Sequence, residues 1–151
     1  MTADPIAAIV ALIAGRAAIS DEIGTDVYGE ELPDSETFVA SMPKAAIAVQ
    51  SAGGVGAGDA SYLPIGGQRF DVDCYAASLY DARRLARIVH AELKAVRREL
   101  VTYTDDTGEV SVLIHAVQVS GGFVALREPV TDWPRVIRTY VAVYAEQEIS
   151  A

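Results

Sequence analysis

A glycine-rich segment, Ser51–Gly67, separates two apolar runs that have the composition of β-strands. Neighbouring strands of a small domain are usually joined by tight loops of about two to five residues. A much longer loop without a helical pattern costs ordering entropy and stabilises no core of its own. We therefore predict that this segment is either disordered or held by something outside the domain.

The run Gly54-Val55-Gly56-Ala57-Gly58 within this segment follows a predicted strand, as a phosphate-binding loop does. Such a loop needs a helix directly after it, whose amide groups and dipole face the anion. Pro64 and the Gly66-Gly67 pair exclude a sustained helix here. The sequence argues against a nucleotide site and favours a flexible projecting loop.

Length and composition favour one globular domain. The chain has 151 residues, of which 51% are hydrophobic, and a net charge of −9. This charge disfavours non-specific binding to nucleic acid or to anionic membranes. Cys74 is the single cysteine, so it has no partner for an intrachain disulfide.

Apart from a short strand at Val27-Tyr28, the predicted elements follow in the order α, β, β, α, β, β. Asp4-Pro5 is a strong helix start, and Ser78 with Asp81 resembles a capping box. We expect a first helix from Pro5 to Gly15 or Ile19, a short strand at Val27-Tyr28, a loop at Leu32–Met42, strands at Ala45–Gln50 and Gln68–Ala76, a helix from Ser78 to about Leu100, a turn at Thr104–Gly108, strands at Glu109–Ser120 and Arg135–Glu146, and an irregular link between these last two. This order predicts an α+β domain with a mainly antiparallel sheet, two helices packed on it and a long strand-to-strand loop.

Two of these elements have a clear apolar side. In Gln68–Ala76 the residues alternate, which predicts a core face and a face exposed to water or to a partner. The core face is Phe70, Val72, Cys74 and Ala76, and the exposed face is Arg69, Asp71, Asp73 and Tyr75. In the second helix the apolar stripe is Ala82, Leu85, Val89, Leu93, Val96 and Leu100.

The charges are unevenly distributed. Acidic residues predominate in residues 1–45, and Glu30 and Glu31 lie among them. Basic residues predominate in residues 80–100, on the polar side of the predicted helix: Arg83, Arg84, Arg87, Lys94, Arg97 and Arg98. The two regions are either solvated faces or, as we prefer, complementary surfaces of neighbouring subunits. A nucleic-acid contact of the basic side is the third interpretation, which the overall acidity of the chain and the lack of interleaved aromatic residues disfavour.

No catalytic constellation rises above background. Cys74 lies on the core face of its strand, where a buried thiol is more common than a nucleophile, and His90 and His115 have no metal-ligand spacing relative to it. Asp71 and Asp73 share a strand face without further ligands nearby, which favours a solvated or interface-facing edge. We predict no cofactor and no metal site.

The order of short motifs resembles the tail-terminator or tail-completion proteins of long-tailed bacteriophages and prophages. The resemblance covers nearly the whole chain and depends on the order of non-catalytic motifs. These are Asp4-Pro5-Ile6-Ala7-Ala8-Ile9, Tyr28-Gly29-Glu30-Glu31-Leu32-Pro33, Met42-Pro43, Ser61-Tyr62-Leu63-Pro64, Gln68-Arg69-Phe70-Asp71-Val72-Asp73-Cys74-Tyr75, Asp81-Ala82-Arg83-Arg84-Leu85-Ala86, Leu126-Arg127-Glu128-Pro129 and Trp133-Pro134.

The resemblance implies a structural, non-enzymatic virion protein without a cofactor, which assembles in the bacterial cytoplasm as a hexameric ring. Such a ring caps the head-proximal end of the tail tube, stops tube growth and offers a docking surface to the head–tail connector proteins. DNA would only pass through its channel, and no membrane is involved. The nearest alternative is a head-side connector ring, and a more distant one is a small ligand-binding or hydrolytic domain.

The resemblance also assigns roles to the unexplained surfaces. The acidic and basic regions, with Glu30, Glu31 and the six basic residues named above, become subunit contacts. The glycine-rich segment becomes an arm that meets a neighbouring subunit or the tube through Tyr62, Leu63 and Ile65. Asp71 and Asp73 become channel-facing residues, whose negative charge would keep passing DNA from sticking.

Overall fold

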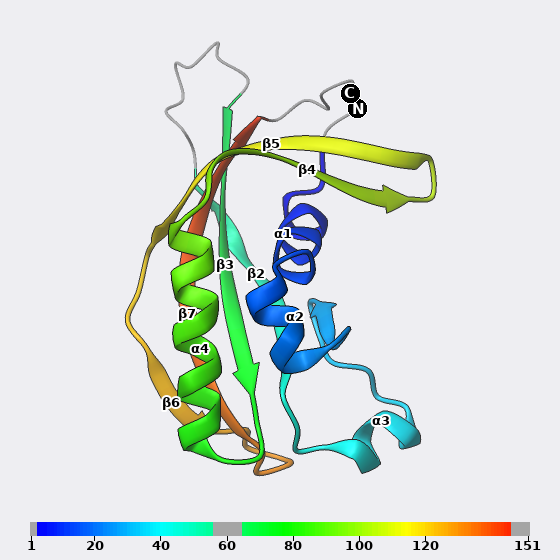
Figure 1. Cartoon of the computed structure of the whole chain (residues 1–151), viewed down its shortest axis with the longest axis vertical. Coiled ribbons are helices and arrows are strands. Elements are labelled where there is room, and N and C mark those ends of the chain that lie inside the picture. The colour runs from blue at the N-terminus through cyan, green and yellow to red at the C-terminus, as the bar shows by residue number, and fades with distance from the viewer. Residues whose placement is uncertain (1–2, 56–64, 146–151) are drawn as a thin grey trace.

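The computed structural model describes residues 3–55 and 65–145, and its main feature is a curled sheet that shares one core with three of the helices (Figure 1). The helices are α1 (Pro5–Ala14), α2 (Ala17–Ile23), α3 (Glu36–Ser41) and α4 (Leu79–Lys94). The strands are β1 (Val27–Gly29), β2 (Ala46–Val55), β3 (Ile65–Tyr75), β4 (Arg97–Asp105), β5 (Gly108–Val119), β6 (Val124–Arg127) and β7 (Pro134–Ala145).

The sheet has the strand order β1-β2-β3-β7-β5-β4, and β6 pairs with the first residues of β7. Among the described strand pairs, only β1 and β2 run parallel. The predicted α+β class with a mainly antiparallel sheet is therefore confirmed. The curl places α1 against β1 near one edge of the sheet and against β4 at the other edge.

Helix α1 begins where the sequence predicts. Oδ1 of Asp4 accepts hydrogen bonds from the backbone N–H groups of Ile6 at 3.0 Å and Ala7 at 3.2 Å, and Pro5 occupies the first helical position. The helix ends at Ala14, so α2 is a separate helix and α1 does not continue to Ile19.

The cap of α1 gives a first prediction. Asp4→Ala removes both hydrogen bonds, so we expect the free energy of unfolding to fall by about 1 kcal/mol. Urea denaturation followed by circular dichroism measures this loss. Asp4→Asn keeps a side-chain acceptor and is the matched control, so an equal loss in both variants would contradict the capping role.

Helix α4 confirms the predicted start and most of the predicted apolar stripe. Ser78 Oγ accepts from the backbone N–H of Asp81 at 3.1 Å, and Ala82, Leu85, Val89 and Leu93 are buried. The predicted extent to Leu100 is wrong, because the helix ends at Lys94 and the chain turns into β4. Leu100 is 50% exposed in that strand.

Three further predictions need correction. The glycine-rich segment is not a loop from end to end, since residues 51–55 continue β2 and residues 65–67 begin β3. The segment Leu32–Met42 contains α3, which Ser35 caps by accepting from the backbone N–H of Phe38. The link after Gly121 contains β6.

The second face of β3 is also partly buried, against expectation. Tyr75 packs in a small cluster with Ala46 and Ala48, and the side chains of Leu32, Met42 and Trp133 pack against this cluster. Asp73 is 1% exposed and lies on the same face. The prediction that Asp73 and Tyr75 face water or a partner is therefore wrong, because both are buried within the chain, and Asp73 contacts Gln50 of β2 and Arg135 of β7.

Candidate functional site

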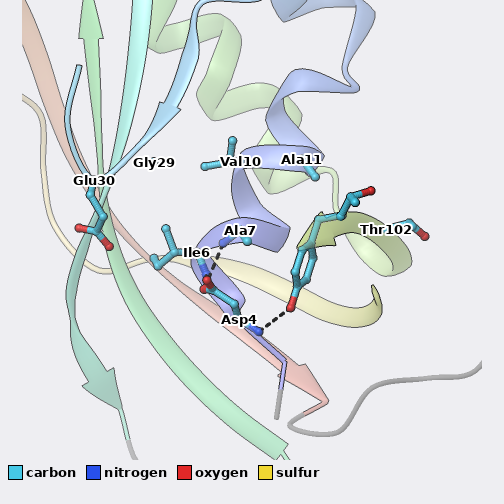
Figure 2. A pocket seen from close by; sticks show the side chains of 10 residues that line it. Asp4, Ile6, Ala7, Val10, Ala11, Gly29, Glu30 and Thr102 are labelled. Atoms are coloured by element: carbon cyan, nitrogen blue, oxygen red, sulfur yellow. Dashed lines mark hydrogen bonds between the residues drawn. The ribbon is translucent and has the colours of Figure 1, made fainter. Parts of the chain in front are cut away.

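An open hollow of about 600 Å³ lies beside α1, between the end of β1 and strand β4 (Figure 2). Side chains of α1 form its apolar floor, and Glu30 and Thr102 stand on opposite sides of it. Its position between β1 and β4 follows from the curl of the sheet around α1.

Three polar residues of this hollow, Asp4, Tyr103 and Glu30, form hydrogen bonds within the chain. The Asp4 carboxylate caps α1, and the backbone N–H of Asp4 donates to the Tyr103 hydroxyl at 2.8 Å. Glu30 Oε2 accepts from the backbone N–H of Ser51 at 3.3 Å. Among the described residues that line the hollow, none is a histidine, cysteine or lysine.

A second, smaller hollow of about 170 Å³, the α4–β6 groove, is lined by Arg83 and Arg87 of α4, by Phe123 directly before β6 and by Ala125 of β6. Phe123 is 47% exposed, and the guanidinium of Arg138 lies 4.0 Å from the centre of its ring. An aromatic side chain beside arginines is a composition typical of protein interfaces. Sequence reasoning missed this groove, because it depends on where the unpredicted strand β6 lies.

The structure divides the predicted basic surface into two parts. Arg83, Arg84, Arg87 and Lys94 are exposed on α4, whereas Arg97 and Arg98 are exposed in β4. Arg84 is engaged within the chain, because its guanidinium forms a two-point ion pair with Glu22, with nitrogen–oxygen distances of 2.8 and 2.9 Å. One basic residue of the predicted subunit surface, Arg84, therefore pairs with an acidic residue of its own chain.

Acidic residues of the basic region also pair within the chain. Arg16 contacts Glu99 at 2.6 Å and Glu92 at 3.8 Å, which ties the end of α1 to α4 and β4. Glu30 and Glu31 are exposed, and they follow directly after β1.

The pKa values of the titratable side chains of Cys74 and His90 are both perturbed by burial. Cys74 is 2% exposed, and burial followed by the charge of Asp73 raises the pKa of its thiol. Burial lowers the pKa of His90, as do Arg138 and Lys94, and its Nδ1 lies 3.0 Å from the Tyr140 hydroxyl. The described part of the chain holds no group of three or more His, Cys, Asp or Glu residues suited to a metal ion.

No helix in the described residues has the length and apolar character needed to cross a membrane.

The arrangement of strands and helices matches that of a chain in a solved virion particle, over almost the whole length of both chains. A chain of the solved "Virion of native gene transfer agent (GTA) particle" aligns with 95% of this chain and 93% of its own length, at 17% identity and a TM-score of 0.55. The two chains share a fold. No protein-family model matches the sequence, and no curated protein matches it.

The remaining predicted contact residues fall in different places. Ile65 is half-buried at the start of β3, opposite Ala145, whereas Tyr62 and Leu63 lie outside the described residues. Asp71 is half-buried, and its Oδ1 accepts from the Thr139 hydroxyl. A channel-facing role stays a prediction for Asp71 and is incompatible with the burial of Asp73.

The base of the glycine-rich segment is held by β7. Gly66 lies opposite Tyr144, and a Cβ atom at Gly66 would come within 2.7 Å of the tyrosine ring. A larger residue there requires the ring to move. Glycine at this position thus permits close packing of the base of the arm, a role that the loop interpretation did not foresee.

Proposed function

We propose that the chain is a structural virion protein that forms a ring on the head-proximal end of a phage tail tube. There it ends tube growth and presents a docking surface to the head. The observation that carries this proposal is the fold shared with a virion chain along 95% of the sequence. The tail-end position is proposed from the resemblance of the motif order to tail-terminator proteins, and a head-side connector ring is the alternative.

The described surface agrees with a structural role. It offers an apolar hollow beside α1 and an arginine-lined groove beside α4, and the described polar groups of the hollow stabilise the fold. Strands β1 and β4 stand at the edges of the sheet, where unpaired backbone groups readily meet a neighbouring chain.

The proposal predicts a direct effect on tube length. We expect the purified chain, added during assembly of its tail tube protein, to give tubes of limited length with a ring at one end. Negative-stain electron micrographs measure both features, and sedimentation measures whether rings also form without tubes. Tubes that grow to the same length with and without the chain would contradict capping.

A pull-down distinguishes the two ends of the connector. A tail-end position predicts co-purification with tail tube protein and not with the portal complex. The reverse result would favour the head-side connector, and a chain that binds neither would contradict a role at the head–tail junction.

A further inference from the structure

The α4–β6 groove joins apolar surface to unpaired positive charge. Arg83 and Arg87 are four residues apart, so they project from one side of α4. Both are exposed, and among the described ion pairs neither takes part in one. Phe123, which is 47% exposed, supplies an apolar wall of the groove. Such a surface suits an acidic segment that also carries an apolar side chain.

The chain itself contains such a segment, residues 31–39, here called the acidic segment. Glu31, Asp34 and Glu36 are exposed, and none of them takes part in an ion pair among the described residues. Val39 follows Glu36 by about one helical turn within α3 and is 42% exposed. The segment therefore presents negative charge next to an exposed apolar side chain.

The groove and the acidic segment lie on opposite sides of the molecule, with β6 on the left of α4 and α3 at the lower right (Figure 1). In the folded chain the acidic segment therefore does not lie at the groove of its own copy. A contact between the groove of one copy and the segment of the next is head-to-tail, and contacts of this kind repeat into rings or filaments.

We propose that the α4–β6 groove of each copy receives the acidic segment of the next copy. Its volume of about 170 Å³ is below the roughly 300 Å³ of small-molecule sites, so the groove suits a single side chain such as Val39. Arg83 and Arg87 then face the carboxylates around it. This inference rests on the proposed ring, and it identifies the surfaces through which neighbouring subunits of the ring would meet.

Charge reversal on each side tests the contact. Groove variant Arg83→Glu/Arg87→Glu and segment variant Glu31→Arg/Asp34→Arg each place like charges opposite each other, and we expect each to weaken self-association about 100-fold in sedimentation. An equimolar mixture of the two is expected to assemble again, because every contact between alternating copies is then between opposite charges. A chain carrying all four substitutions is expected to assemble for the same reason.

The matched control is Asp106→Arg/Glu109→Arg, which reverses two exposed acidic residues near the β4–β5 turn and should assemble like the native chain. Circular dichroism verifies that each variant folds. Native-like assembly by both reversed variants, or no recovery in the mixture, would overturn the contact while leaving the ring intact. An equal loss in the control would also overturn it. A native chain that remains monomeric, alone and with tail tubes, would overturn the ring and the contact together.

Discussion

Phe70→Ala is expected to remove about 3 to 5 kcal/mol from the free energy of unfolding. Phe70 is 0% exposed in the middle of β3 and lies directly opposite Tyr140 of β7. The two rings stack with their centres 5.6 Å apart and their planes inclined by 23°. Alanine would lose this contact and leave a cavity that the surrounding strands cannot fill. Since small domains are stable by only about 5 to 15 kcal/mol, the loss is a large share of the total.

Guanidinium denaturation measures this effect, and Tyr140→Phe is the matched control. The control keeps both rings and removes only the hydrogen-bonding contact between the Tyr140 hydroxyl and His90 Nδ1, so we expect it to lose about 1 kcal/mol. A loss in Phe70→Ala no larger than in the control would show that the stacked pair is not a central part of the core.

The importance of Phe70 could be predicted because strand alternation is a local signal. The same holds for the caps at Asp4 and Ser78 and for the apolar stripe of α4, since each depends on residues a few positions apart. These signals defined α1, β3 and α4, together with β5 and β7, and with them the α+β class.

Strand β4 was missed because two periods fit the same residues. Leu93, Val96 and Leu100 continue the helical stripe, whereas Val101 and Tyr103 lie in a strand in which buried and exposed residues alternate. The segment is a strand because it pairs with β5 through a tight turn at Asp106 and Thr107. That pairing is not visible in the local sequence.

The site was only partly predictable for a related reason. The sequence pattern indicates which residues share a face of an element, but not which other segments cover that face. The excess of basic residues in α4 was visible, yet the ion pair between Arg84 and Glu22 and the position of Phe123 depend on tertiary packing. Asp73 was assigned to an exposed face for the same reason.

The burial of Asp73 makes the stability of the protein depend on pH in an unusual direction. Burial raises the pKa of Asp73 to about 6 from its ordinary value of 3.8, although the nearby Arg135 guanidinium lowers it. Arg135 Nη1 is 3.6 Å from Asp73 Oδ2, which also accepts from Gln50 Nε2 at 3.1 Å. Oδ1 is buried without a hydrogen-bond partner among the described residues. The charged carboxylate is thus incompletely compensated.

The folded state binds this proton more tightly than the unfolded chain does. The contribution of Asp73 to stability is therefore fully present below the unfolded pKa of 3.8 and is lost as the pH rises through about 6. Relative to Asp73→Asn, which cannot titrate, the free energy of unfolding of the native chain should rise by about 2 kcal/mol between about pH 7 and about pH 4. Other carboxyl groups are common to both proteins, so they largely cancel in this difference.

Urea denaturation of both proteins across this pH range measures the effect, and the carboxyl ¹³C chemical shift of Asp73 measures its titration directly. We expect a titration midpoint near pH 6, in accord with the raised pKa. Parallel stability curves for the two proteins, together with a midpoint at the ordinary value, would mean that Asp73 is solvated. A solvated Asp73 would restore the channel-facing role that its burial excludes, so this measurement also decides which carboxylates of β3 are available to line a channel.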